Sequence, residues 1–237
     1  MVYLGKETRF TWLGHSAFLI ETPSGQRVLI DPWLEGNPKC PTQFKDPGKV
    51  DSILVTHGHG DHLGDTVALA LRHGCQVVCN FEIGEWLASK GVRNVIAMNK
   101  GGTVEVGSLL VTMTNAFHSS SIADGGQLIY GGEPAGYVCE TENEFRFYHA
   151  GDTCVFGDMK LIGELHQPHL AMLPIGDRFT MGPREAAKAA HLLNVKLVVP
   201  MHYGTFDLIP GTPAALRKAL GALPIEVAAL EPGQVLE

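Results

Sequence analysis

The segment at residues 56–62 constrains this chain most, because it places three histidines and an aspartate within a few residues of each other. It reads Thr56-His57-Gly58-His59-Gly60-Asp61-His62. Residues 50–55 precede it, and their apolar, β-branched character predicts a buried strand. His57 and His59 would point to the same side of an extended backbone, and the two glycines let that backbone turn tightly. Imidazole and carboxylate groups at the end of a strand predict a metal site rather than a chance cluster of surface histidines.

This segment resembles the H-x-H-x-D-H signature of the metallo-β-lactamase superfamily, and later residues match that family's remaining ligands. His118 follows an apolar segment, Asp152 lies in a Gly-Asp-Thr turn, and His202 ends another apolar segment. The resemblance runs from Phe10 to about Gln234. It implies an αββα sandwich, in which two sheets face each other and helices cover the outer faces.

The resemblance also implies two divalent metal ions and a residue for each position around them. It assigns His57, His59 and His118 to the first metal, Asp61, His62 and His202 to the second, and Asp152 to a bridge between them. Asp61 would also orient the attacking water. Imidazole and carboxylate ligands suit zinc, manganese or iron, and we expect zinc. Within the superfamily, the chain is most similar to small cytoplasmic metal-dependent hydrolases related to ascorbate-phosphate lactonase and to N-acyl-phosphatidylethanolamine phospholipase D.

The order of apolar segments predicts two similar halves within a single domain spanning residues 1–237. Expected strands in the first half cover 8–21, 27–32, 50–56, 76–80 and 103–114, with helices at 65–73 and 82–90. The second half repeats the pattern, with strands at 135–140, 145–150, 170–174, 197–201 and 225–230 and helices at 158–166, 183–193 and 212–220. We expect loops at 33–48 and 119–134, which could cover the site.

Composition narrows the classes of partner. The formal net charge of −7 gives no general basic field, so nucleic acid is an improbable main ligand. The five cysteines lack C-x-x-C spacing, which favours free thiols in a reducing compartment. The charged start of the sequence and the lack of a long apolar run predict a cytoplasmic protein without a membrane span. Homo-oligomers are common among such folds, but no sequence feature fixes the oligomeric state.

Further residues are candidates for substrate contact or catalysis, and each has a structural alternative. His15, at a glycine bend, could contact substrate and donate a proton, or could hydrogen-bond within its loop. Tyr203 could donate a hydrogen bond to an oxyanion, with Thr205 beside it in the substrate site, or could pack under the metal ligands. Arg178 could bind an anionic group of the substrate, or could be a solvated loop residue.

Asp31 ends a strand beside the predicted metal site. We expect Asp31 to support a metal ligand or to make a hydrogen bond within a turn, and contact with substrate is the less favoured alternative.

The leading hypothesis is a hydrolase in which two metals activate water to attack a small ester, lactone, amide or phosphodiester. One alternative is a phosphodiesterase or nuclease acting on short nucleic acids. Another is a metal-binding protein without turnover. Gly60 stands where the related flavin-linked di-iron oxidoreductases carry a glutamate, which weakens a redox interpretation.

Overall fold

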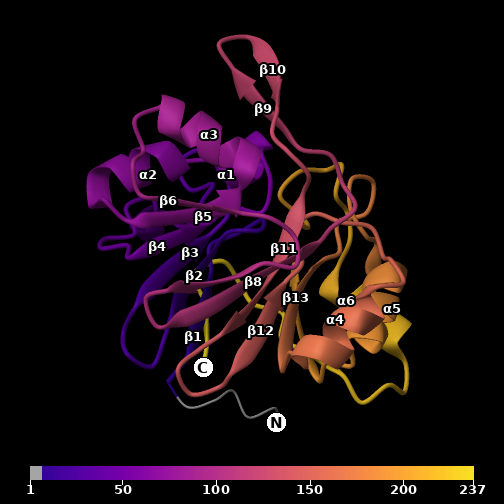
Figure 1. The fold of residues 1–237 in the computed structure, drawn as a ribbon. Coiled ribbons are helices and arrows are strands. Elements are labelled where there is room, and N and C mark those ends of the chain that lie inside the picture. Colours follow the sequence, from indigo (N-terminus) through magenta and orange to yellow (C-terminus); the bar gives the residue numbers. More distant parts are fainter. Residues whose placement is uncertain (1–6) are drawn as a thin grey trace.

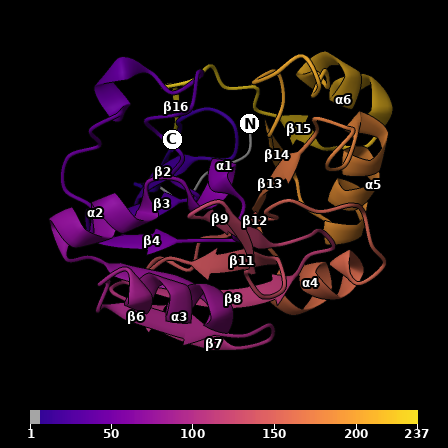
Figure 2. The ribbon, with the colours of Figure 1, turned by 90° about the horizontal axis from the view of Figure 1, so that it is seen from above.

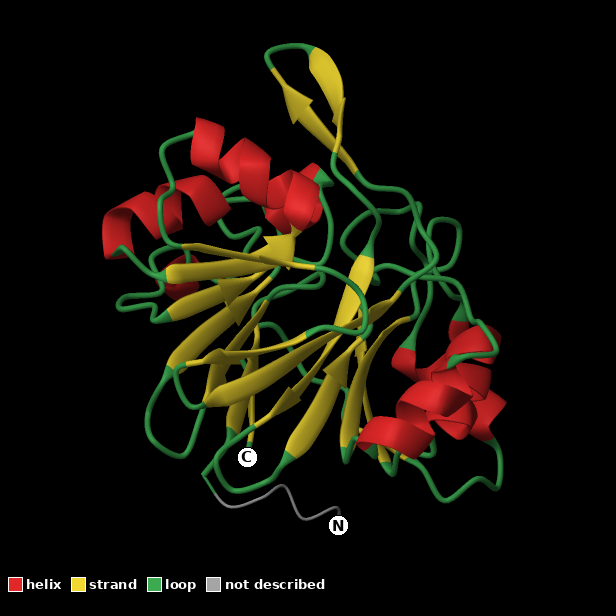
Figure 3. Ribbon diagram, in the orientation of Figure 1, coloured by secondary structure: helices red, strands yellow, loops and turns green. Residues whose placement is uncertain are grey.

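Two mixed β-sheets pack face to face, and helices cover the outer face of each (Figures 1 and 3). The computed structural model of the chain describes residues 7–237. Viewed from above, the helices of the first half lie on one side of the paired sheets and those of the second half on the other (Figure 2). This arrangement confirms the predicted αββα sandwich. No helix among the described residues is long and apolar enough to cross a membrane.

The first sheet is built mainly from the N-terminal half of the chain. Its strands lie in the order β16 (Val235–Leu236), β1 (Arg9–Trp12), β2 (Phe18–Glu21), β3 (Arg27–Ile30), β4 (Ser52–Leu54), β5 (Gln76–Asn80) and β6 (Val95–Met98). The strands from β16 to β3 pair antiparallel, and those from β3 to β6 pair parallel. Its helical elements are η1 (Thr42–Phe44), α1 (Gly60–Leu63), α2 (Thr66–His73) and α3 (Phe81–Ser89).

The second sheet has the same plan and also takes in the strands at 103–114, which the sequence pattern groups with the first half. Its strands lie in the order β15 (Glu226–Val227), β14 (Leu197–Met201), β13 (Leu170–Pro174), β12 (Arg146–His149), β11 (Ala135–Glu140), β8 (Leu109–Asn115) and β7 (Thr103–Val106). The helices beside it are α4 (Met159–His166), α5 (Pro183–Leu193) and α6 (Pro213–Leu220). Small alanines on the buried face of α5 let this helix lie close to the sheet.

Apolar side chains from both sheets fill the space between them. Phe10 of the first sheet meets Phe147 of the second edge to face, with 5.1 Å between ring centroids, and both are fully buried. Tyr137 of β11 crosses the interface, and its hydroxyl donates a 2.7 Å hydrogen bond to the carbonyl of Val55. Because Val55 lies just before the histidine-rich segment, this bond fixes that segment against the opposite sheet.

The segment expected as a loop at 119–134 contains a β-hairpin instead. Strands β9 (Ser121–Asp124) and β10 (Gln127–Tyr130) pair antiparallel and project beyond the two sheets (Figure 1). The turn between them is Gly125-Gly126, and both glycines have positive φ, as the tight turns of hairpins require. The glycines that suggested a loop therefore make the turn of a hairpin. The structure also adds β6, β16 and the single helical turn α1, which the sequence pattern did not predict.

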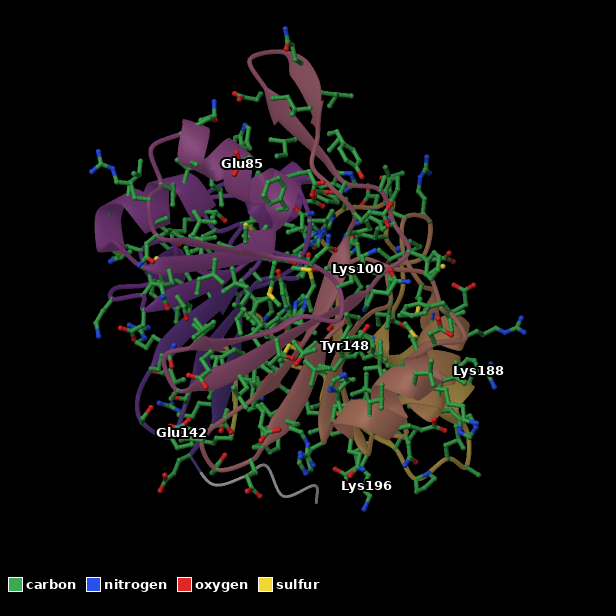
Figure 4. The ribbon with its side chains drawn as sticks, viewed as in Figure 1. Glu85, Lys100, Glu142, Tyr148, Lys188 and Lys196 are labelled. Atoms are coloured by element: carbon green, nitrogen blue, oxygen red, sulfur yellow. The ribbon has the colours of Figure 1, made fainter. Side chains whose placement is uncertain are left out.

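We predict that Tyr137→Phe destabilises the fold by about 1–3 kcal/mol, because it leaves the buried Val55 carbonyl without its donor. Urea denaturation at a fixed metal concentration measures this loss. Tyr148→Phe is the matched control, since Tyr148 is also fully buried but packs on the face of β12 that α4 covers (Figure 4). Equal losses in the two variants would contradict a specific role for the bond between the sheets.

Candidate metal centre

The predicted metal ligands converge because the strands that precede them end at one edge of the sandwich. His57 and His59 follow β4, and Asp61 and His62 lie in α1. The other three come from the second sheet, where His118 follows β8, Asp152 follows β12 and His202 follows β14. The edge at which parallel strands end is where α/β sheets most often carry their ligand sites.

The first group consists of His57, His59 and His118. The Nε2 atom of His57 lies 3.0 Å from Nδ1 of His59, and one nitrogen from each of the three histidines lies within 4.8 Å of the others. Nitrogens this close fit a common cation in front of all three rings. His57 is fully buried, whereas His59 and His118 are partly exposed.

The second group consists of Asp61, His62 and His202, with His15 beside them. The Nε2 atoms of His62 and His202 each lie 3.9 Å from Oδ2 of Asp61. The ligand atoms of the four side chains all lie within 4.8 Å of one another. This spacing is suitable for a second cation adjacent to the first group.

Asp152 lies between the two groups. Its Oδ2 atom is 3.1 Å from Nε2 of His202 and 3.5 Å from Nε2 of His118, while its Oδ1 atom is 3.3 Å from Nε2 of His62. One carboxylate therefore contacts histidines of both groups, which is the position that the resemblance implies for a bridging residue.

Several buried polar atoms at this point make no hydrogen bond. They include Nε2 of His62, Nε2 of His202 and Oδ1 of Asp152. Although His62 and Asp152 approach to 3.3 Å, the geometry between them is not that of a hydrogen bond. A buried polar atom without a partner costs about 1–3 kcal/mol. Divalent cations would satisfy these three atoms at once, so the donor set fits the predicted metals.

Asp31 orients two of the histidines from behind. Its Oδ2 atom accepts a 2.7 Å hydrogen bond from Nδ1 of His62 and another of 2.7 Å from the hydroxyl of Thr56. That hydroxyl in turn accepts from Nδ1 of His57 at 3.0 Å. Both imidazoles therefore carry their proton on Nδ1 and present Nε2 to the centre of the cluster. Thr56 was not among the predicted site residues, because its role depends on Asp31, which lies 25 positions away.

Burial and the charges within the cluster together set most of the protonation states that metal binding requires. Burial lowers the pKa of His57 well below its usual value and also lowers that of His59 and His118. For Asp152, burial opposes ionisation, but His202 and His62 hold its pKa well below the usual range. His62 is the exception, since burial is outweighed by Asp152 and Asp31, which raise its pKa. The raised pKa favours the doubly protonated imidazole of His62, and a cation bound at Nε2 would displace the proton on that nitrogen.

His15 is held at both ring nitrogens. Nε2 lies 3.0 Å from Oδ2 of Asp61, and Nδ1 lies 2.9 Å from the hydroxyl of Thr205. Burial lowers the pKa of His15 to about 4, so its ring is neutral near pH 7. A carboxylate can only accept, so the proton lies on Nε2 and the Thr205 hydroxyl donates to Nδ1. Thr205, predicted to bind substrate, thus contacts His15 in this structure.

Three residues of the site other than glycine have left-handed backbone conformations. His15, Asp31 and His202 have φ values of 56°, 48° and 53°. Such conformations cost about 1–3 kcal/mol each and persist only where the surrounding contacts hold them. A 2.9 Å hydrogen bond from the amide of His202 to the carbonyl of His15 provides one such contact. It also joins the two sheets at the site.

Tyr203 and Arg178 lie in surroundings that match their structural alternatives. The ring of Tyr203 stacks on Trp12, with 5.4 Å between centroids. Burial raises the pKa of Tyr203 to about 12, and Glu231 and Arg217 are the charged groups that act on it. Arg178 is exposed, and its guanidinium lies 5.4 Å from the ring centroid of Phe179. None of these contacts supports the predicted roles in oxyanion or substrate binding, which stay predictions.

The chain is similar to known proteins in family, sequence and fold. The sequence model of the beta-lactamase superfamily domain matches residues 26–203. A UPF0173 metal-dependent hydrolase of Rubrobacter xylanophilus is 54% identical over 97% of this chain and 96% of its own length. A UPF0173 metal-dependent hydrolase of Koribacter versatilis is 52% identical over 95% of this chain and 96% of its own length.

A solved structure is similar over nearly the full length. Igni18, described as a novel metallo hydrolase from the hyperthermophilic archaeon Ignicoccus hospitalis, has a TM-score of 0.86 and 35% identity, and the match covers 98% of each chain. Family, sequence and fold thus agree with the histidine and aspartate cluster. The chain belongs to the metallo-β-lactamase superfamily and is a metal-dependent hydrolase similar to the UPF0173 proteins.

Proposed function

We propose that this hydrolase uses two divalent cations to activate water against a small ester, lactone, amide or phosphodiester. The position of Asp152 carries this proposal, because its two oxygens contact histidines of both groups. A structural metal site is usually mononuclear and closed by four ligands. A shared carboxylate between two sets of nitrogen donors instead supports a dinuclear, catalytic site.

His57, His59 and His118 would hold one cation, Asp61, His62 and His202 the other, and Asp152 both. When bound, such a pair lowers the pKa of water toward about 7 and polarises the oxygen of the bond to be cleaved. Imidazole and carboxylate ligands are compatible with zinc, manganese or iron, and zinc is the metal we propose.

Asp61 and His15 would position the water. The Asp61 side chain is 33% exposed, so solvent reaches it, and its carboxylate can accept a hydrogen bond from the attacking water. His15 donates to Oδ2 of Asp61 and is itself held by Thr205. Because the His15 ring is buried and neutral, we assign it a positioning role: it fixes the Asp61 carboxylate and keeps its own proton on Nε2.

We predict two equivalents of metal per chain in protein purified without chelator or affinity nickel. Asp152→Ala should bind at most one equivalent and lose turnover, because both groups lose a shared ligand. Elemental analysis and a chromophoric chelator assay measure the stoichiometry. A wild-type protein that saturates at one equivalent would contradict the dinuclear proposal.

We predict that Asp31→Asn weakens zinc binding by about 10–100-fold without removing a metal ligand, because His62 and His57 lose the charge that orients them. Competition with a chelator of known affinity measures the change. Asp51→Asn is the matched control. Asp51 accepts a hydrogen bond from the amide of Arg27, as Asp31 does from the amide of Thr56, but it precedes β4, at the end of that strand away from the metal ligands. Equal weakening in the two variants would indicate a general loss of stability.

We predict that His15→Ala lowers kcat by about tenfold or more while two equivalents of metal remain bound, because Asp61 loses its fixed orientation. Thr205→Val should cause a smaller loss in the same direction, since it removes only the hydroxyl that supports His15. The pH profile of kcat distinguishes this positioning role from proton donation. A fall in kcat at high pH that occurs in the wild type but is absent in His15→Ala would show that His15 acts as an acid instead.

A further inference from the structure

An aromatic pair lies at the end of the cluster that contains His15. The ring of Trp33 lies 5.2 Å from that of His15, and the ring of Phe206 lies 5.8 Å from it. Trp33 and Phe206 contact each other, with 6.0 Å between centroids. Phe206 is 44% exposed and Trp33 is partly exposed, so this pair presents an apolar surface to solvent beside Asp61 and His202.

A second aromatic pair lies at the other end, beside His118. Phe117 directly precedes His118, and its ring lies 5.1 Å from that of Phe156. Phe117 is 54% exposed, and Phe156 is partly exposed. Phe156 follows Asp152 by only a few residues, so both members of this pair lie on segments that carry predicted ligands.

Main-chain atoms of Phe117 and Trp33, one residue of each pair, hydrogen-bond to segments that carry or support predicted ligands. The amide of Phe117 donates to the hydroxyl of Thr153 at 3.0 Å, and its carbonyl accepts from the amide of Cys154 at 3.2 Å. The amide of Trp33 donates to the carbonyl of Asp31 at 2.8 Å. Exposed apolar patches often mark ligand-binding sites, and aromatic side chains commonly line such sites.

Solvent-accessible ligands of the cluster adjoin both pairs, since Asp61 contacts His15 beside the first pair and His118 follows Phe117 of the second. Asp61 is 33% exposed and His118 is 15% exposed at the side chain, whereas His57, His62, Asp152 and His202 are almost fully buried. Gly60 has open space where a β-carbon would lie. A substrate whose scissile bond reaches the metals here has one substituent near Trp33 and Phe206 and the other near Phe117 and Phe156.

We propose that the substrate is a carboxylic ester, lactone or amide that is apolar on both sides of the bond to be cleaved. This inference rests on the proposed function and narrows its substrate class. The aromatic pairs supply apolar surface to the acyl side and to the leaving-group side. With a formal net charge of −7, the chain provides no general attraction for a polyanion such as nucleic acid.

The test compares 4-nitrophenyl hexanoate with 4-nitrophenyl acetate on the zinc-loaded protein, with each rate divided by that of alkaline hydrolysis. We expect kcat/KM to favour hexanoate by about tenfold or more. Phe117→Ser or Phe206→Ser should reduce this preference by about threefold or more, according to which pair takes the acyl chain. Leu165→Ser is the control, because Leu165 is a 75% exposed apolar residue on α4, and it should leave the preference unchanged.

A preference near one in the wild type, or a faster normalised rate on bis(4-nitrophenyl) phosphate, would overturn the inference and leave the hydrolase proposal intact. If none of the three substrates is cleaved, hydrolysis of esters and phosphodiesters as proposed above fails. Intrinsic fluorescence then tests the aromatic contact separately, with the free carboxylates hexanoate and acetate as probes. Hexanoate should quench the fluorescence of Trp33 more than acetate does, and this difference should disappear in Trp33→Phe. No difference between the two carboxylates would overturn the inference without any reference to turnover.

Discussion

His62 lies between two buried carboxylates, and the geometry of the site depends on this contact. Asp31 binds Nδ1 at 2.7 Å from one side, and Asp152 lies 3.3 Å from Nε2 on the other. Each carboxylate would be costly to bury alone. Asp31 is compensated by hydrogen bonds from Thr56 and His62, whereas Oδ1 of Asp152 has no hydrogen-bond donor. This unsatisfied carboxylate oxygen therefore lies where the proposed cations would bind.

Polar bonds between the sheets hold the two halves of the site in register. Tyr137 donates to the carbonyl of Val55, and Nε2 of His149 lies 3.1 Å from the carbonyl of Ser16. The first bond fixes the segment before His57, and the second fixes the bend that carries His15. Since the predicted ligands come from both sheets, their spacing depends on this alignment as much as on the ligands themselves.

The sequence predicted the parts of the structure that local pattern encodes. Apolar runs located β5, β13, α5 and β14 at their observed bounds, and the ligand cluster follows from residues that end such runs. Contacts between distant residues left no comparable signal. His15 and Thr205 are 190 positions apart, and nothing in either segment predicts their hydrogen bond. The short strand β16 is also invisible locally, because its strand character comes from pairing with β1.

The same distinction between local sequence pattern and distant contacts explains why the hairpin was not predicted and why Tyr203 packs away from the site. Alternation of apolar and polar residues is too brief in β9 and β10 to outweigh the glycines around them, so the region looks like a loop. Tyr203 follows His202 directly, and adjacency in sequence suggested a shared role. The left-handed backbone at His202 separates their directions, and the Tyr203 ring stacks on Trp12 instead.

The β9–β10 hairpin contacts the rest of the fold near its tip and at its base, and the contacts at the base reach the metal site. Near its tip, Asp124 accepts from Nε1 of Trp86 at 2.9 Å and pairs with Lys90 at 2.6 Å. At its root, the amide of Gly58 donates to the hydroxyl of Ser120 at 3.1 Å, and Ile122 packs against Gly58 so closely that a β-carbon there would lie 2.8 Å from it. Gly58 is the residue between His57 and His59. The base of the hairpin therefore contacts the one peptide unit that sets the spacing of the first two imidazoles.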